Sequence, residues 1–544
     1  MVSGGADFGQ AALSQKRAQF AGPSGIKGLI GSSHVFAIAV FASLGGFVYG
    51  YNQGMFGQIL SMTSFSNTVH PESISNTTLR GFLTAILELG AWVGVLVNGI
   101  MADASGAGLR LLLALSFSSM LVPLYNAELS PPELRGSLVS LQQLAICFGI
   151  MISYWIGYGT NFIGGTGEGQ SNAAWLVPVC IQLLPALVLG VGIMFLPESP
   201  RWLAKKGRDE ESLQVIANLR RKSPQDEGVQ LEYLEIKAQH MFERETSIAK
   251  FPHLQGGGLM NNIKLGFNEY AALLKNKSLF KRVTIAVFIM VFQQWSGINA
   301  ILYYASFIFK DLGLTGSTTS LLAGGVGGVL LFLATIPAVL YIDQWGRKPL
   351  LITGAIGMGV SHIIVAGLQG KYQSSWDTHK AAGWVAVVFV WIYEVNFGYS
   401  WGPGAWVLIS EIFPLGARAK GISIGGSSNW LNNFAIGQAT PDMVAAMTYG
   451  TFIFFGAICF LAAAFVYFVV PETKNLTLEE MDEIFGDTAG TAVEDRDRLN
   501  KIYVELGLFS AHEVETRASV SAGVKRPSFL EHHEQGPDAE KASP

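Results

Sequence analysis

The stretch FQQWSGINAILYY, at positions 292–304, lies inside an apolar run that is long enough to cross a lipid bilayer. Three carboxamides stand within this run: Gln293, Gln294 and Asn299. Carboxamides at hydrocarbon depth are costly unless they face a cavity, a ligand or another helix. Because positions three apart share a face of a helix, Gln293 and Asn299 fall on one side. The stretch therefore predicts a membrane span with one polar face, which suits a ligand that carries many hydroxyl groups.

The composition is that of a membrane protein. Of the 544 residues, 50% are hydrophobic and 14% are charged, whereas about a quarter of the residues in soluble domains are charged. The 63 glycines suit membrane helices that approach one another closely. A net charge of −4 argues against nucleic acid as a partner.

No pattern in the sequence predicts catalysis or a metal site. Cys147, Cys180 and Cys459 all lie in apolar stretches without metal-ligand spacing, so we expect small buried side chains. Neither a nucleophile–base pair nor a phosphate-binding loop is evident. We therefore expect no metal, no cofactor and no enzyme activity.

The apolar windows predict an all-α, polytopic bundle of membrane helices. Ten windows approach or exceed the roughly 20 residues that a span requires. They lie at about 35–60, 82–102, 137–160, 174–196, 281–309, 319–342, 349–369, 382–412, 420–439 and 450–470.

Charge divides the chain into five regions. The polar region between the two groups of windows is rich in Lys and Arg, which assigns it to the cytoplasm. Both termini are then cytoplasmic, and we expect the plasma membrane as the location. The regions are an N-terminal segment at 1–34, a first membrane half at 35–196, a helical cytoplasmic loop at 197–279, a second membrane half at 280–470, and a tail at 471–544 that we expect to be largely disordered after 486.

The two membrane halves repeat one another. ELSPPELR at 128–135 recurs as EIFPLGAR at 411–418, and DASG at 103–106 recurs as DQWG at 343–346. A PES or PET triplet follows each half. Two similar halves joined by a long loop are what a transporter with alternating access needs, because two bundles must rock about a central site.

Four motifs in this order resemble the sugar porter family of the major facilitator superfamily. They are PESPRW at 197–202, QQWSGIN at 293–299, DQWGRK at 343–348 and PETK at 471–474, and the wording is most similar to fungal monosaccharide (hexose/pentose) transporters. The resemblance covers about residues 35–485. It implies a major-facilitator fold, transport of a monosaccharide of the glucose or xylose class, a lipid bilayer as surroundings, and one chain per pore.

The first half departs from this pattern in length. The two acidic motif positions are 68 residues apart in the second half (Asp343 and Glu411), but 25 apart in the first (Asp103 and Glu128). We expect an internal deletion of the third and most of the fourth span, which leaves about ten full spans instead of twelve. The apolar remnant at 109–124 is a re-entrant piece, a fragment lying against the bundle, or the mark of a skipped segment.

Position 52 also departs from the pattern. Proton-coupled members that the chain resembles usually place an aspartate where Asn52 stands, and Asn cannot titrate. This favours facilitated diffusion, with proton symport as the alternative because Glu88 and Glu394 also lie within predicted spans.

The resemblance also implies a binding site. A sugar needs carboxamides, which both donate and accept hydrogen bonds, and an aromatic ring that stacks on its C–H face. An Asn often contacts sugar at the position that Leu331 holds here, which would cost one hydrogen bond of about 1 kcal/mol. The alternative role of such polar groups is to join helices. The substrate residues carried over by position are Gln143, Gln293, Gln294, Asn299, Trp406 and Asn429, with Tyr303 and Tyr304 closing the site from outside.

Charged residues at the cytoplasmic helix ends have a different expected role. In the family they form ion-pair networks that hold the halves in the outward-facing state. Ala107 and Gly108 replace the basic pair of the second half, so we expect a weakened latch and an inward-leaning equilibrium. The gate residues are Glu128, Arg135, Glu198, Arg201, Asp343, Arg347, Glu411 and Arg418.

Three further expectations remain open at the level of sequence. Asn76, in an NTT sequon of the first external loop, is a candidate glycosylation site. A transporter-like sugar receptor that signals through its tail is one alternative to a carrier. A truncated chain that does not transport is the other.

Overall fold

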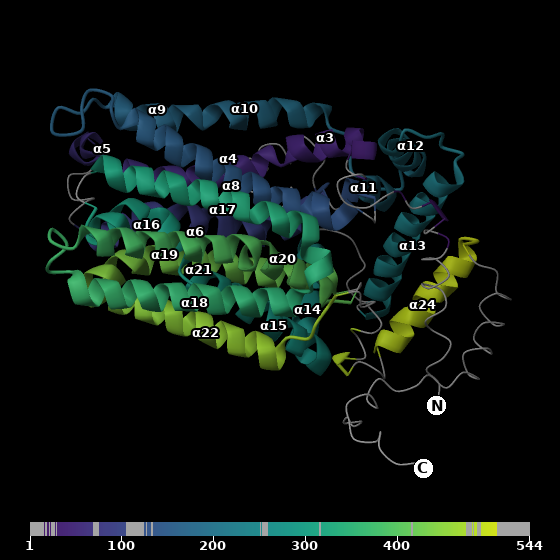
Figure 1. Cartoon of the computed structure of the whole chain (residues 1–544). Helices are drawn as coiled ribbons and strands as arrows, with labels where there is room; N and C mark the ends of the chain where they lie inside the picture. Colours follow the sequence, from purple (N-terminus) through teal and green to yellow (C-terminus); the bar gives the residue numbers. More distant parts are fainter. Residues whose placement is uncertain are drawn as a thin grey trace, which may run out of the picture. The chain divides into compact units, whose positions relative to one another are not determined.

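The computed structural model of the chain is helical. It describes residues 16, 19–20, 22, 28, 30–68, 76–104, 125–126, 128–131, 134–250, 252, 259–314, 317–414, 417–474, 481, 484–486 and 491–508. Every regular element in this part of the chain is a helix, which confirms the predicted all-α class (Figure 1). The predicted remnant at 109–124 lies outside the described residues.

The chain divides into two compact units, 1–21 with 489–544, and 22–488. In the first unit the described helix is α24 (Thr491–Glu505), and Lys16 Nζ donates to Leu508 O at 2.7 Å. The prediction of disorder after residue 486 is wrong for these residues. Leu499, Ile502 and Tyr503 are buried at helical spacing, so the segment has an apolar stripe that the charged composition conceals.

The second unit contains the membrane helices and the central loop. Figure 1 shows its long helices side by side, with α9 and α10 along one edge and α18 and α22 along the other. The first half comprises α3 (Ser33–Ala42), α4 (Leu44–Ile59), α5 (Thr63–Thr68), α6 (Thr77–Ala104), α8 (Arg135–Thr160), α9 (Ala173–Ile181), α10 (Leu183–Gly192) and the 3₁₀ turn η3 (Ile193–Phe195). The central loop contributes α11 (Pro200–Lys205), α12 (Asp209–Arg220), α13 (Glu227–Lys250) and α14 (Leu259–Lys275). The second half comprises α15 (Lys277–Trp295), α16 (Ile298–Asp311), α17 (Ser317–Trp345), α18 (Arg347–Tyr372), α19 (Lys380–Tyr399), α20 (Trp401–Glu411), α21 (Arg418–Met447) and α22 (Gly450–Val469).

Eight helices or consecutive helix pairs among the described residues are long and apolar enough to cross a membrane. They coincide with eight of the ten predicted windows. The other two windows fall on α6 and α21, which are continuous helices of 28 and 30 residues that pack against each other. Both carry polar side chains into this contact, such as Glu88 and Asn433, so their composition is less apolar than that of the other spans.

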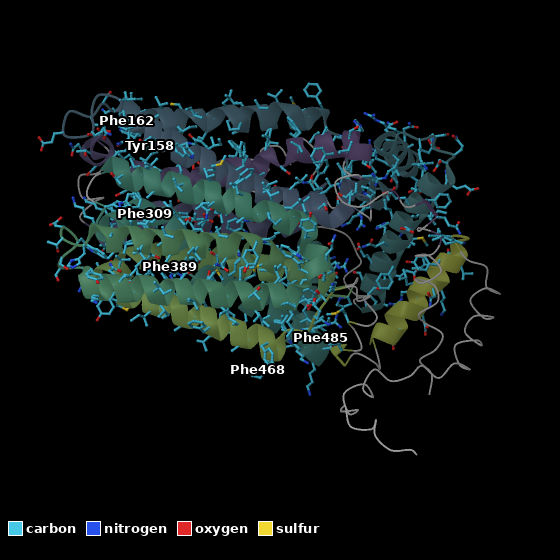
Figure 2. All side chains as sticks on the ribbon, in the orientation of Figure 1. Tyr158, Phe162, Phe309, Phe389, Phe468 and Phe485 are labelled. Carbon is cyan, nitrogen blue, oxygen red and sulfur yellow. The ribbon has the colours of Figure 1, made fainter. Side chains whose placement is uncertain are left out.

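Exposed apolar side chains cover the outside of the helices. Phe162, beyond the end of α8, is 49% exposed, and Phe468, near the end of α22, is 80% exposed. Figure 2 shows these two rings at opposite ends of the bundle. Aromatic residues concentrate at both surfaces of a bilayer, where an apolar ring meets the headgroups.

The predicted span that contains positions 292–304 is broken into α15 and α16. Gly297, between them, has φ +96°, a conformation that residues with a side chain rarely adopt. A Cβ atom there would also lie 2.9 Å from the Phe455 ring, so space and conformation both require glycine. The break places Gln293 and Gln294 at the end of one helix and Asn299 at the start of the next. Interrupted helices of this kind supply binding groups in membrane transporters.

Candidate functional site

Gln293 joins three helices of the second half. Its Nε2 donates to Trp401 O at 2.8 Å and to Gly402 O at 3.2 Å, at the start of α20. Its Oε1 accepts a hydrogen bond of 2.7 Å from Asn429 Nδ2, on α21. The side chain is 3% exposed, so the amide has both its donor and its acceptor in use within the protein.

Gln294 and Asn299 continue this polar set across the break. Asn299 Nδ2 donates to Gln294 Oε1, and Asn299 Oδ1 accepts from Gln53 Nε2. Gln53 lies on α4, so this last hydrogen bond connects the two membrane halves. Gln53 was not among the predicted site residues, although it directly follows Asn52 and is one more carboxamide within a predicted span.

The other residues that the sequence singled out differ in their distance from these carboxamides and in their burial. A Cβ atom at Gly402 would be 3.6 Å from Gln143 Nε2, which places the half-buried Gln143 beside the backbone that Gln293 contacts. Trp406, on α20, is also half-buried and packs against the core of the second half. Asn52 donates to Val48 O of its own helix at 3.0 Å. Leu331 is 2% exposed and packs in the apolar core.

Tyr303 and Tyr304 are buried on α16. Tyr303 OH lies 2.7 Å from Glu88 Oε1 of α6, and 3.0 Å from Asn433 Oδ1 of α21. Tyr304 OH donates to Gly437 O at 2.8 Å. Both hydroxyl groups thus have hydrogen-bond partners on helices other than α16.

More contacts between the halves lie at the end of the bundle that holds α5 and the start of α6, which we call the outer end. Thr77 and Thr78, at the start of α6, donate to Asp442 of α21. Gln438 Nε2 of α21 donates to Thr78 O at 3.0 Å. The two halves are therefore in contact at the outer end of the described conformation. Asn76 precedes these residues and caps α6 by accepting from Leu79 N at 3.0 Å, which leaves its amide group exposed.

The charged residues at the opposite end form a compact network within the second half. Arg347, which is 5% exposed, donates through Nε and Nη2 to the Glu411 carboxylate at 3.0 and 2.6 Å. Thr473 Oγ1 donates to the same carboxylate at 2.6 Å. Glu472 accepts from the backbone N–H groups of Arg347 and Lys348 at 2.9 and 3.0 Å. Burial alone would raise the pKa of Glu472, but its bonds to four backbone N–H groups outweigh burial and lower that pKa.

The other predicted gate residues are arranged differently. Glu198 forms an ion pair of 2.9 Å with Arg208, which was not among the predicted gate residues. Arg418 lies near both Glu411 and Arg201, so the start of α11 is close to the start of α21. Glu128 is half-buried. The side chains of Arg135 and Asp343 lie outside the described residues.

Replacing Arg347 by alanine is expected to lower the free energy of unfolding by about 2 kcal/mol, because it leaves the partly buried Glu411 carboxylate without its bidentate partner. The matched control is Lys222→Ala, which removes an exposed 3.1 Å ion pair with Asp226 and should cost less than about 1 kcal/mol. Thermal unfolding of the purified chain in detergent measures both. Equal destabilisation by the two variants would contradict the structural role of Arg347.

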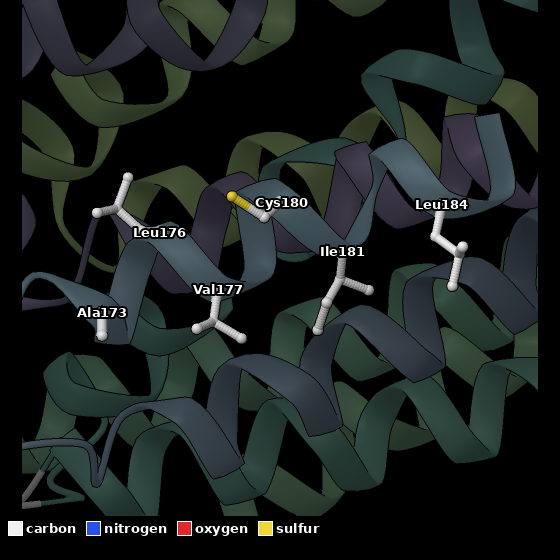
Figure 3. A pocket seen from close by; sticks show the side chains of 6 residues that line it. All are labelled: Ala173, Leu176, Val177, Cys180, Ile181 and Leu184. Atoms are coloured by element: carbon white, nitrogen blue, oxygen red, sulfur yellow. The ribbon is translucent and has the colours of Figure 1, made fainter. Parts of the chain in front are cut away.

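A groove of about 410 Å³ runs along α9 and α10, away from the polar set (Figure 3). Its wall is apolar, so it offers nothing to a ligand with many hydroxyl groups and suits contact with lipid chains. Cys180 lies exposed in it, so the expectation that all three cysteines are buried is wrong for this one. The lining residues are Ala173, Leu176, Val177, Cys180, Ile181 and Leu184.

Comparison with known proteins finds one family model, that of sugar (and other) transporters, over residues 38–118 and 110–485. The two matched segments meet within residues 105–124, where the sequence predicts the deletion. An MFS glucose transporter from Aspergillus flavus is 30% identical over 87% of this chain and 94% of its own. A probable quinate permease from Aspergillus niger is 31% identical (83% and 88%), and the high-affinity glucose transporter 1 of Candida albicans is 29% identical (84% and 86%).

Solved structures show the same architecture. The major facilitator superfamily proton:xylose symporter XylE, bound to 6-bromo-6-deoxy-D-glucose, matches with a TM-score of 0.64 at 27% identity, over 84% of this chain and 99% of that one. A partially occluded inward-open structure of the xylose transporter XylE from E. coli gives 0.63 at 26% identity, over 82% and 100%. The fold is therefore a multi-pass membrane bundle of the major-facilitator type, as predicted.

Proposed function

We propose that this chain, which belongs to the sugar (and other) transporter family, carries a monosaccharide of the glucose or xylose class across a membrane by alternating access. The observation that carries the proposal is the buried set Gln293, Gln294 and Asn299 at the break between α15 and α16. These carboxamides meet partners from α4, α20 and α21, so they lie where both halves can reach a ligand. Gln143, Trp406 and Asn429 are the further substrate residues that we propose.

A neutral sugar suits this site better than an organic acid such as quinate, which carries a carboxylate. The buried cationic side chains in the described residues are Arg282 and Arg347. Arg282 donates to Ile412 O at 2.7 Å, and Arg347 forms an ion pair with Glu411. Both guanidinium groups therefore have partners at the end of the bundle opposite the outer end. Neither contacts the carboxamide set, and a buried carboxylate without a cationic partner would be costly.

Facilitated diffusion is the mechanism that we propose, because Asn52 has no titratable proton and bonds its own helix. Proton symport is the second candidate. It is favoured by Glu88, which is fully buried and contacts Tyr303 of the other half. The chain would act as a monomer in the plasma membrane with both termini in the cytoplasm, and Asn76 would be available for glycosylation.

Uptake of labelled glucose and xylose by cells that lack their own hexose carriers tests the proposal. We expect uptake several-fold above that of cells with an empty vector, and we expect a protonophore to leave it unchanged. Uptake that the protonophore abolishes would replace facilitated diffusion by symport. Absence of uptake, with uptake restored by a 43-residue insert after Gly106 whose sequence follows that of the second half, would identify a truncated chain that does not transport.

A further inference from the structure

Four side chains form a closed ring of polar contacts between the membrane halves. Glu88 of α6 contacts Tyr303 of α16 at 2.7 Å, and Tyr303 contacts Asn433 of α21 at 3.0 Å. Asn433 Nδ2 lies 3.3 Å from Tyr49 OH of α4, which returns to the Glu88 carboxyl at 3.1 and 3.2 Å. Glu88, Tyr303 and Asn433 are at most 2% exposed. The ring thus consists of four contacts between four buried or half-buried groups.

The number of hydrogen atoms available to this ring decides whether the Glu88 carboxyl group is ionised or protonated. Each phenol supplies one hydrogen atom. The Asn433 amide can donate in only one of its two contacts, because it makes one of them through its nitrogen and the other through its oxygen. Three hydrogens therefore serve four contacts, and reversing the amide does not change that number. An ionised Glu88 would leave two oxygens facing each other at hydrogen-bond distance. A proton on Glu88 completes the ring, since it then donates to Tyr303, which donates to Asn433, which donates to Tyr49, which donates to Glu88.

We propose that Glu88 is a proton-binding site that fills when the outer end of the transporter closes. This inference rests on the proposed alternating access. Closure brings Tyr303 and Asn433 of the second half against Glu88 and Tyr49 of the first, and it takes up one proton from the outer solution. Opening separates the four groups, admits water to the carboxyl and returns that proton to the same side. Acid outside therefore favours the closed outer end, without net movement of protons across the membrane.

Among the residues that the structure describes, the side chains that contact Glu88 carry no charge that would hold it ionised. The titratable groups that contact it are the two phenols, and the group facing it from α21 is the neutral Asn433 amide. Arg80, nearer the outer end of α6, lies 4.6 Å from the centre of the Phe307 ring. Asp442, at the outer end of α21, accepts from Thr78 at 3.2 Å. The packing face of α14 against α6 contributes no described partner to the Glu88 carboxyl.

Infrared difference spectroscopy of the purified full chain in lipid vesicles tests the protonation directly. At neutral pH we expect a C=O stretching band of a protonated carboxylic acid that Glu88→Gln removes. The matched control is Glu394→Gln, which changes the other buried carboxyl, on α19, and should leave the Glu88 band in place. A second variant, Tyr303→Phe, keeps the carboxyl but breaks the ring, so the band should weaken. A spectrum in which Glu88→Gln removes only carboxylate bands would overturn the proposal.

The link to closure is measured with an impermeant thiol reagent on Thr84→Cys, a position buried near the outer end of α6, in a Cys180→Ala background. One linked proton allows labelling to fall by up to about tenfold for each unit of external acidification. In Glu88→Gln, whose amide supplies the fourth hydrogen permanently, labelling should stay low and not vary with pH. Equal variation of labelling with pH, with and without the Glu88→Gln substitution, would contradict the link between proton binding and closure. Entry of one proton with each sugar molecule, in a manner that depends on Glu88, would also contradict the proposal. Because the infrared and labelling experiments need no sugar, their outcome is separate from a failure of sugar transport.

Discussion

Replacing Gln293 by alanine is expected to raise the sugar concentration at half-maximal uptake by about 10- to 100-fold. The Gln293 amide makes two hydrogen bonds to the start of α20 and accepts one from Asn429. A sugar that enters the site replaces these partners of the Gln293 amide. Its hydroxyl groups then gain one hydrogen-bond donor and one acceptor from the same side chain. The loss of two such bonds costs about 1–3 kcal/mol, which corresponds to this factor. Initial rates of labelled glucose uptake over a range of concentrations measure it.

The control for this variant is Gln369→Ala. Gln369 is a second glutamine of the same half, 5% exposed on α18, and its Oε1 has no hydrogen-bond partner. Its replacement should leave the half-maximal concentration unchanged once uptake is normalised to the amount of protein at the membrane. If both variants weaken uptake alike, or if Gln293→Ala behaves as the unchanged protein does, Gln293 does not bind the sugar.

Replacing Gly57 by alanine is expected to reduce uptake by about 100-fold, because it obstructs closure of the outer end. A Cβ atom at Gly57, on α4, would lie 2.3 Å from Tyr303 O and 3.2 Å from Leu302 O, both on α16 of the other half. Backbone carbonyls cannot turn aside as a flexible side chain can, so the halves must separate. Such overpacking costs about 3 kcal/mol, which destabilises the closed state by roughly this factor. Uptake of labelled sugar measures the loss, and binding of sugar from the outside should persist.

Gly90→Ala is the matched control for Gly57→Ala. Gly90 is also a helical glycine in the first half, but no atom lies within 4 Å of the Cβ that it would gain. Alanine favours a helix over glycine by about 1 kcal/mol, so this variant should fold and transport at least as well as the parent chain. Normal uptake by Gly57→Ala would show that α4 and α16 need not approach this closely during the transport cycle.

The sequence predicted the helices well where one strong signal determines them. Eight of the ten long apolar windows coincide with helices or helix pairs that could cross a membrane, and the other two fall on the long helices α6 and α21, because a bilayer fixes both the length and the polarity of a membrane helix. The break at Gly297 did not follow from hydropathy, because a single glycine with positive φ does not change the average of a window. The helix α24 was missed for the opposite reason, since its charged residues outweigh the stripe formed by Leu499, Ile502 and Tyr503.

The site was predicted in part. Gln293, Gln294 and Asn299 stand close together in the sequence, so their proximity was visible there, and the structure adds Asn429 of α21 as a partner of Gln293. Contacts between the halves were not predictable, since they depend on how distant helices face each other. Gln53 with Asn299, and Glu88 with Tyr303, are two such pairs. The partner of Glu198 was missed because Arg208 lies beyond the motif that carries the family resemblance.

The account depends most on whether a chain with a short first half still transports. Counterflow in liposomes that contain the purified full chain measures this directly. The liposomes are loaded with unlabelled glucose and then diluted into a trace of labelled glucose. The account predicts a transient accumulation of label above the outside concentration, which excess external glucose abolishes. Label that enters no faster than in liposomes without protein would contradict the account, and it would leave a sugar receptor or a truncated chain as the alternatives.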